Sequence, residues 1–440
     1  MRTIGGDKKM TNGIIRIGCV TAVLTVSFAL AAAETPSVAA RQSVSDVLRR
    51  AESGENLTVV WFGGSLTWGA NATDPNLTSF RGRMNERFLK NYPKAHWTFV
   101  DSAIGGVGSQ MAVFRVDRDV VSKNPDLVFV DFSVNDGLDA SGDLASESAE
   151  GAVRRILERT KAAVVPVIMP LRKYVVEPNE QALRRRTEHL ALARHYGLPV
   201  GDVLGEMRAM NAAGKLNLDE VWLKEFGDNS HPYDSGYALY ADIVWRQVIA
   251  HPSSARLAEL PPPIGRNVYG KVCRASLRSA AKLPRGWRTT VPYLRAGSFD
   301  FSCSRWMDSM TVAANCRPKA YTDYELTGET PEPLKLRFKG AVVALMGESM
   351  ENSGSVEIRI DGKQVGEGPW DTKGMMAWGF APSAYWFQTV ESKLNPEDWH
   401  TLELLPHLKE GCPEQVRLES ICAAGPNEAQ VMFGLSEGQR

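Results

Sequence analysis

The chain has 440 residues, of which 43% are hydrophobic, and its 51 basic and 51 acidic side chains give a formal net charge of zero. A chain of this length exceeds one ordinary hydrophobic core, so two domains are expected. The balanced charge disfavours a nucleic acid or an anionic membrane surface as partner, because both attract a basic excess.

The first 33 residues have the pattern of an export signal. Lys8, Lys9 and Arg16 precede an apolar run, 17–33, that contains no charged residue and ends in alanines. We expect residues 1–33 to be a cleaved signal peptide and the mature protein to be secreted or periplasmic, without stable membrane insertion. The alternative is an uncleaved anchor, for which the run is short.

Cysteine usage is compatible with export. The cysteines after residue 33 are Cys273, Cys303, Cys316, Cys412 and Cys422. An oxidising compartment permits disulfides, and the pairs closest in sequence are Cys303–Cys316 and Cys412–Cys422. The connectivity stays open, because the number is odd and spacing alone does not fix it.

Residues 44–255 alternate apolar runs of β type with helical patterns. The expected strands are Thr58–Phe62, Trp97–Ala103, Leu127–Phe132, Val164–Met169 and Pro199–Val203. The expected helices lie near Phe80–Tyr92, Met111–Ser122, Glu147–Lys161, Asn179–Tyr196 and Ser235–Ile249. Strands that are apolar throughout are typical of a parallel sheet covered on both faces. The pattern predicts a doubly wound α/β domain whose ligands bind beyond the carboxyl ends of the strands.

A second domain is expected after a proline-rich linker at 256–266, which contains Pro261-Pro262-Pro263. From 267 to 440, apolar and polar residues alternate in short runs separated by Gly, Pro and Asp. This pattern predicts a β-sandwich, such as a jelly roll. The tryptophan-containing segment 370–386 is the candidate for a carbohydrate-binding platform or a cover over the active site.

The residues with the clearest chemistry follow expected strands. Ser65 comes directly after the first strand and two glycines, and Asp228 and His231 stand three residues apart far downstream. A serine hydroxyl needs a base to become a nucleophile, and an imidazole base needs a carboxylate to orient it. Ser65 could instead cap the next helix. Asp228 and His231 could instead bind zinc, but no third ligand has suitable spacing, so neither a metal nor another cofactor is expected.

Four short motifs in order resemble those of the SGNH hydrolases, also called the GDSL family. They are Gly63-Gly64-Ser65-Leu66, the glycine-rich Ile104–Ser109 around Gly106, Ser133-Val134-Asn135-Asp136, and Asp228-Asn229-Ser230-His231-Pro232. Two positions depart from the family pattern: Gly64 replaces an aspartate and Ser133 replaces a glycine. The resemblance covers about half of the chain and implies a flavodoxin-like three-layer α/β/α domain. It also implies Ser65, His231 and Asp228 as catalytic residues.

The same resemblance implies an oxyanion hole made by the amides of Ser65 and Gly106 and the side chain of Asn135. Trp68, Arg115 and Trp378 are further candidates for substrate contact, although Arg115 could equally form a surface ion pair. With the second domain, the family resemblance implies an exported esterase acting on O-acyl, mainly O-acetyl, groups of a carbohydrate. The open alternatives are a lipid-directed esterase of the same fold and a carbohydrate-binding protein without catalysis.

Overall fold

The computed structural model describes residues 41–140, 142–255, 259–292, 307, 309–320, 323–373 and 383–433. The expected signal peptide, Cys303 and Trp378 lie outside this part of the chain. Within it, no helix combines the length and apolar character needed to cross a bilayer.

A five-stranded parallel sheet forms the centre of the first domain, in the order β2-β1-β3-β4-β5. Its strands are β1 (Asn56–Gly63), β2 (His96–Asp101), β3 (Leu127–Asp131), β4 (Ala163–Ile168) and β5 (Gly201–Asp202). This is the strand order of flavodoxin-like folds. The expected fold class is therefore confirmed, and each strand lies where an apolar run predicted it.

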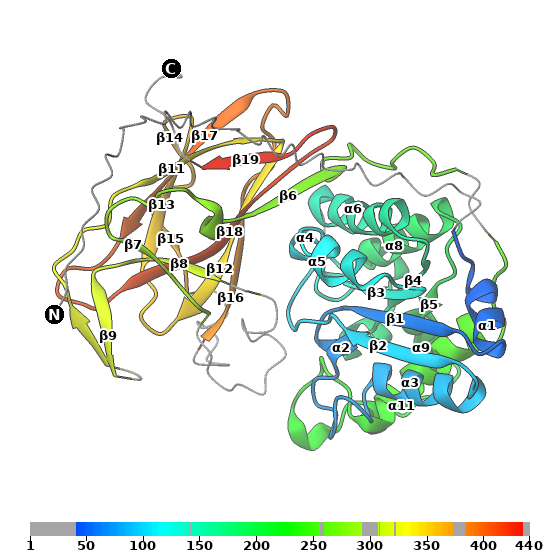
Figure 1. Cartoon of the computed structure of the whole chain (residues 1–440). Helices are drawn as coiled ribbons and strands as arrows, with labels where there is room; N and C mark the ends of the chain where they lie inside the picture. Colours follow the sequence, from blue (N-terminus) through cyan, green and yellow to red (C-terminus); the bar gives the residue numbers. More distant parts are fainter. Residues whose placement is uncertain are drawn as a thin grey trace, which may run out of the picture. The chain divides into compact units, whose positions relative to one another are not determined.

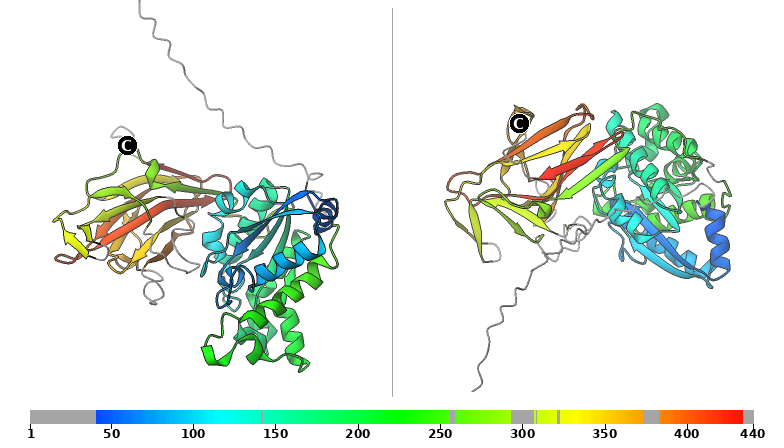
Figure 2. Two further views of the ribbon diagram at one scale, coloured as in Figure 1. Left: turned by 60° about the horizontal axis from the view of Figure 1, so that its bottom comes forward. Right: turned by 45° about the horizontal axis from the view of Figure 1, so that its top comes forward.

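Helices cover both faces of this sheet (Figures 1 and 2). Because side chains alternate along a strand, Val60 and Phe62 pack with helices α4, α6 and α8 on one face, while Val59 and Trp61 pack with α1, α3, α9 and α11 on the other. The helices are α1 (Val44–Glu52), α2 (Ser65–Trp68), α3 (Phe80–Asn91), α4 (Ser109–Ala112), α5 (Val116–Asp119), α6 (Asp143–Arg159), α7 (Arg172–Val176), α8 (Arg184–His195), α9 (Val203–Ala212), α10 (Leu218–Val221) and α11 (Asp234–Val244).

The expected helix at 111–122 is wrong as a single element. The chain forms α4, α5 and a 3₁₀ turn, η2 (Val121–Lys123), with a non-helical backbone at Val120 (φ −123°, ψ −63°). Several β-branched valines in this stretch lower its helix propensity. Helices α1 and α9 were not expected. Ser43 forms a capping box for α1 and Asp202 caps α9, so both begin at identifiable residues.

The second domain consists of antiparallel sheets, two of them six-stranded, in the orders β14-β13-β17-β11-β19 with β15 on β13, and β16-β12-β18-β8-β7 with β6 on β18. Both contribute to one hydrophobic cluster, with Leu336 and Ile358 from the first and Leu345 and Leu418 from the second. The expected β-sandwich is therefore present (Figure 1). Its strands are β6 (Lys271–Ser276), β7 (Trp287–Thr290), β8 (Met310–Ala314), β9 (Cys316–Ala320), β10 (Asp323–Leu326), β11 (Leu334–Lys339), β12 (Val342–Met350), β13 (Ser355–Ile360), β14 (Lys363–Gln364), β15 (Trp370–Asp371), β16 (Ser383–Glu391), β17 (Trp399–His407), β18 (Gln415–Gly425) and β19 (Gln430–Phe433).

The candidate disulfide Cys412–Cys422 is wrong, because both residues are free thiols. Cys412 precedes β18 and Cys422 lies seven steps beyond the start of that strand at Gln415. An extended strand rises about 3.3 Å per residue, so Cys422 lies roughly 20 Å along β18 from Gln415, far more than the reach of a disulfide. Cys316 is also a free thiol; its candidate partner Cys303 is outside the described residues.

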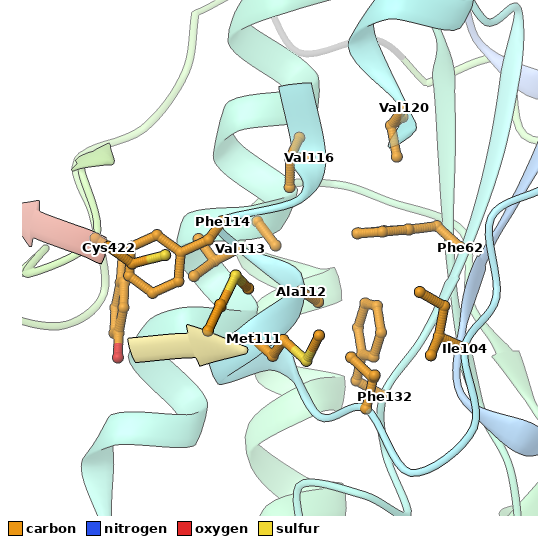
Figure 3. Packing of buried hydrophobic residues seen from close by; sticks show 14 of the residues in the cluster. Phe62, Ile104, Met111, Ala112, Val113, Phe114, Val116, Val120, Phe132 and Cys422 are labelled. Carbon is orange, nitrogen blue, oxygen red and sulfur yellow. The ribbon is translucent and has the colours of Figure 1, made fainter. Parts of the chain in front are cut away.

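The segment after the prolines is bound to α6. The amide of Ile264 donates to Glu150 Oε1 at 2.7 Å, and Arg266 forms an ion pair with Glu147. Tyr269 is buried, and its ring lies 6.0 Å from that of Phe114. The hydrophobic cluster around Phe114 continues to Cys422 of β18, as Figure 3 shows. The described residues thus belong to one compact unit.

Candidate active site

The turn between β1 and α2 has no room for side chains at its two glycines. A Cβ at Gly63 would lie 2.2 Å from Thr67 Oγ1, and one at Gly64 would lie 2.3 Å from Asn135 Oδ1. The turn therefore brings the backbone close to neighbouring loops and begins α2 at Ser65. Ser65 is 8% exposed, so it is buried but not completely enclosed.

Ser65, His231 and Asp228 form one hydrogen-bonded chain. Ser65 Oγ lies 2.9 Å from His231 Nε2, and His231 Nδ1 lies 2.8 Å from Asp228 Oδ2. The other carboxylate oxygen of Asp228 accepts hydrogen bonds from the amides of Ser230 at 2.7 Å and His231 at 3.1 Å. The three side chains expected from the sequence are thus brought together in the order in which a nucleophile, a base and an acid would be linked.

The environment of Asp228 favours its ionised form. Burial alone would raise the pKa of this carboxyl group, but hydrogen bonds from the His231 side chain and the Ser230 amide hold the pKa well below its ordinary range. Asp228 therefore stays an anion at all pH values at which the protein would work. A permanent carboxylate can fix the imidazole with Nδ1 protonated, which leaves Nε2 free to accept a proton from Ser65.

Gly106 and Asn135 lie on the loops that follow β2 and β3. Gly106 has a positive φ of 73°, a conformation that favours glycine. The side chain of Asn135 occupies the space beside Gly64, as the 2.3 Å approach above indicates. This explains one departure from the family motif, because an aspartate at position 64 would clash with Asn135 as it is placed here.

A cavity of about 340 Å³ borders these two loops. Its lining includes Gly106 and Asn135, together with Gln110 of α4 and Tyr385 and Phe387 of β16 in the second domain. Ser65 is not among the lining residues. The cavity is large enough to hold a sugar-sized group next to the two candidate oxyanion donors.

Asp136 connects the same two loops. Its Oδ1 accepts a hydrogen bond from the amide of Ser109 at 2.7 Å, and its side chain is 2% exposed. The loop that carries Gly106 is therefore tied to the loop that carries Asn135. His189 Nε2 lies 3.6 Å from Asp136 Oδ2 on the far side of this contact.

Asp131 is a residue of the site that was not predicted from the sequence. It ends β3, and its carboxylate accepts hydrogen bonds from Ser133 Oγ at 2.8 Å and Thr67 Oγ1 at 3.2 Å. Ser133 Oγ in turn accepts from the amide of Met169 at 3.0 Å. Burial raises the pKa of Asp131 to about 6, although the hydrogen bonds from Ser133 and Thr67 act in the opposite direction.

This arrangement gives the other departure from the family motif a structural role. Ser133 stands where the motif has glycine, and its hydroxyl links Asp131 to the end of β4. Asp131 also binds Thr67 of α2 and thereby joins the turn that carries Ser65 to the loop of Asn135. The signal in the sequence is one acidic residue at the end of an otherwise apolar strand.

The three additional substrate-contact candidates have different outcomes. Trp68 is half-buried on α2, one turn after Ser65. Arg115 is neither a surface residue nor open to substrate: it is 1% exposed, pairs with Asp119 at 2.7 Å and donates to the carbonyl of Ser102 at 2.9 Å. Its guanidinium also lies over the ring of Phe62, so its role is in the core beneath the site. Trp378 lies outside the described residues, and Trp386 packs in the sandwich core.

No group of three or more potential metal-binding side chains occurs in the part of the chain that the structure describes. His231 is hydrogen-bonded to Asp228 through one ring nitrogen and to Ser65 through the other, an arrangement that matches an acyl-transfer site.

Residues 61–239 match the GDSL-like Lipase/Acylhydrolase family. The α/β domain is a GDSL-like acylhydrolase domain. The matched range contains the Ser65 turn, both candidate oxyanion loops and the Asp228–His231 turn, and this protein is a carboxylic ester hydrolase with a GDSL-like domain.

Solved structures resemble both domains of this esterase together. A two-domain esterase active on acetylated mannans, co-crystallised with mannopentaose, has a TM-score of 0.65 and 22% identity, covering 88% of this chain and 97% of that one. A second structure of a two-domain esterase active on acetylated mannans has a TM-score of 0.61 and 21% identity, covering 89% and 98%. At this identity the likeness establishes the shared fold. A search of curated proteins found no match.

Proposed function

We propose that this GDSL-type esterase is an exported enzyme that removes O-acetyl groups from a carbohydrate, with Ser65 as the nucleophile. The observation that carries the proposal is the Ser65–His231–Asp228 chain, with its 2.9 Å and 2.8 Å contacts, in a GDSL-like domain. The proposal of export rests on the signal-like residues 1–33, and an exported enzyme would meet extracellular polysaccharides.

The reaction proceeds in two steps through an acyl-enzyme. His231 Nε2 accepts the proton of Ser65 as Oγ attacks the ester carbonyl carbon, and the ester C–O bond then breaks as the alcohol leaves with that proton. Water repeats the sequence on the acyl-enzyme, releases the carboxylic acid and restores Ser65. Asp228 stabilises the imidazolium that forms in both steps.

Negative charge that develops on the carbonyl oxygen needs donors fixed in advance. The amides of Ser65 and Gly106 and the side-chain amide of Asn135 supply them in this proposal. The tie from Asp136 to Ser109 keeps the Gly106 and Asn135 loops at a constant spacing, so little reorganisation is needed during the reaction.

The carbohydrate part of the proposal has two supports. The two-domain fold resembles that of an esterase active on acetylated mannans. In addition, Tyr385 and Phe387 of the second domain line the cavity that borders Gly106 and Asn135. Aromatic rings offer the broad amphipathic surface that suits a sugar.

A serine-directed organophosphonate probe and an ester panel test the proposal. We expect the wild type to be labelled, Ser65→Ala to be unlabelled with kcat lower by several orders of magnitude, and the exposed Ser122→Ala to behave as the wild type. Rates on chromogenic esters should fall as the acyl chain lengthens beyond acetyl, and acetylated oligosaccharides should release acetate. Equal labelling of Ser65→Ala would overturn the catalytic assignment, and a preference for long acyl chains would favour the lipid-directed alternative.

A further inference from the structure

The loop 69–73, directly after α2, is fastened to the turn that carries the acid and the base. The carbonyl of Ala70 accepts a hydrogen bond from Tyr237 on α11 at 2.7 Å. Two atoms of Thr73 bind Asp234 at the start of α11, the amide at 2.9 Å and Oγ1 at 2.5 Å. Asn71 lies between these two attachments, and its side chain turns towards the Asp228–His231 turn.

Asn71 donates from Nδ2 to Asp228 Oδ2 at 2.9 Å and more weakly to the carbonyl of His231 at 3.4 Å. Oδ2 is the same oxygen that binds His231 Nδ1 at 2.8 Å. The other donors to Asp228 found in the described residues, Ser230 and His231, belong to its own turn. Asn71 is therefore a link between the nucleophile side of the site and the acid.

The backbone of Asn71 supports this role. Its φ is +68°, and asparagine tolerates this left-handed conformation better than most residues. The conformation turns the side chain back towards Asp228 over a loop of only a few residues. No sequence periodicity marks such a residue, so it could not be predicted from the sequence.

We propose that Asn71 is a positioning residue for the hydrolytic reaction, which holds the Asp228 carboxylate so that Asp228 in turn orients His231 towards Ser65. The inference rests on the proposed function, but its failure can be told apart from a failure of that function. The Asn71 side chain donates to Asp228 and to the carbonyl of His231, so it acts through these residues, and its loss should affect proton transfer rather than substrate binding.

Two charged groups beside this turn have partners of their own. Asp234 is bound by Thr73 and is also stabilised as an anion by the charge of Arg83, and the guanidinium of Arg172, whose amide contacts Asn229, is paired with Asp219. An extra negative charge at position 71 would therefore act mainly on Asp228 and His231.

Asn71→Gly removes the donor and keeps a backbone that accepts a positive φ. We expect kcat on a small chromogenic acetate ester to fall about five- to tenfold with KM unchanged, because a hydrogen bond to a charged group is lost at a partly exposed site. Asn71→Asp keeps the shape and adds a carboxylate. It should lower kcat further and move the acidic limb of the pH–rate profile to higher pH, because the added charge stabilises protonated His231.

Asn124→Gly is the matched control. Asn124 is also exposed with a positive φ, 48°, but lies in the turn after η2, away from the acid and base, so its replacement should leave kcat unchanged. A double-mutant cycle separates positioning from general destabilisation. If Asn71 acts through Asp228, Asn71→Gly should cost little further activity in the Asp228→Asn variant. If Asn71→Gly only reduced the amount of folded protein, it would lower the activity of the wild type and of Asp228→Asn by the same factor.

Two outcomes would overturn the inference while leaving the esterase function intact: unchanged kcat and pH profile in Asn71→Gly and Asn71→Asp, or full additivity in the cycle. Wild-type hydrolysis that equals that of Ser65→Ala would instead refute the proposed function itself.

Discussion

Replacement of Asp131 by asparagine should change the free energy of unfolding in a pH-dependent way. Relative to the wild type, the variant should be more stable at neutral pH than it is at acidic pH. Burial raises the pKa of Asp131 to about 6 from an ordinary 3.8. A raised carboxyl pKa means that the folded state binds the proton more tightly than the unfolded chain does. The resulting stabilisation of the folded state is fully present below the pKa of Asp131 in the unfolded chain. It is lost as the pH rises through the pKa of Asp131 in the folded state.

The size of the effect follows from the two pKa values. A difference of about 2 units corresponds to about 3 kcal/mol over the whole window, of which about 2 kcal/mol falls between about pH 4.5 and about pH 7.5. The amide of the Asp131→Asn variant carries no charge at any pH, and it can still accept from Ser133 and donate to Thr67. The difference in unfolding free energy, wild type minus variant, should therefore decrease by about 2 kcal/mol across this range.

Urea unfolding of both proteins at a series of pH values, followed by tryptophan fluorescence, gives this difference directly. Other titrating groups are common to both proteins and cancel. Thr67→Val removes a hydrogen bond that lowers the pKa of Asp131. The pH range over which the stability difference decreases should therefore extend to higher pH in this variant. A difference that is constant with pH, or that grows in favour of the wild type as the pH rises, would refute the reasoning.

Further predictions concern the reaction. Asn135→Ala should lower kcat by roughly 10²–10³ with little change in KM, and steady-state kinetics would separate this from a binding role. Gly106→Ala should lower the free energy of unfolding by roughly 1 kcal/mol, because alanine is disfavoured at a φ of +73°, and should also lower activity; unfolding and rate measurements check the two effects. Wild-type activity should fall on acidification as His231 becomes protonated, and Asp228→Asn should cost at least about 100-fold in kcat; a flat pH profile would exclude a histidine base. EDTA should leave activity unchanged. Phe387→Ala should raise KM for an acetylated oligosaccharide more than for a chromogenic acetate.

The parallel sheet could be predicted because its strands are continuous apolar runs, and their carboxyl ends had to share one edge. The residues after β1, β2 and β3 therefore converge, as Ser65, Gly106 and Asn135 illustrate. The Asp228–His231 turn was recognisable from its motif. The pairing of a serine with a distant histidine follows from topology, whereas the 2.9 Å distance between them required the structure.

Other residues of the site could not be predicted, because they act through single tertiary contacts that leave no repeating pattern. Asn71 and Asp131 are ordinary residues in the sequence and acquire their roles only when loops meet. Arg115 illustrates the opposite error. An arginine in a supposed helix suggested a surface or pocket residue, but the helix breaks there and the side chain turns inward to Asp119 and Ser102. Tertiary contacts of this kind override local propensity.

The attachment of the segment 264–269 to α6 has an evolutionary consequence. Glu150, 5% exposed, relies on the amides of Ile264 and Gly265 as well as on Tyr196, and Tyr269 fills the space over Gly151. Recombination at the prolines would leave a buried carboxylate short of donors and an apolar surface uncovered. A chimera that exchanges the sandwich for another domain should therefore be joined after Tyr269. The unit that can be exchanged in evolution is then the α/β domain together with the first residues beyond the prolines.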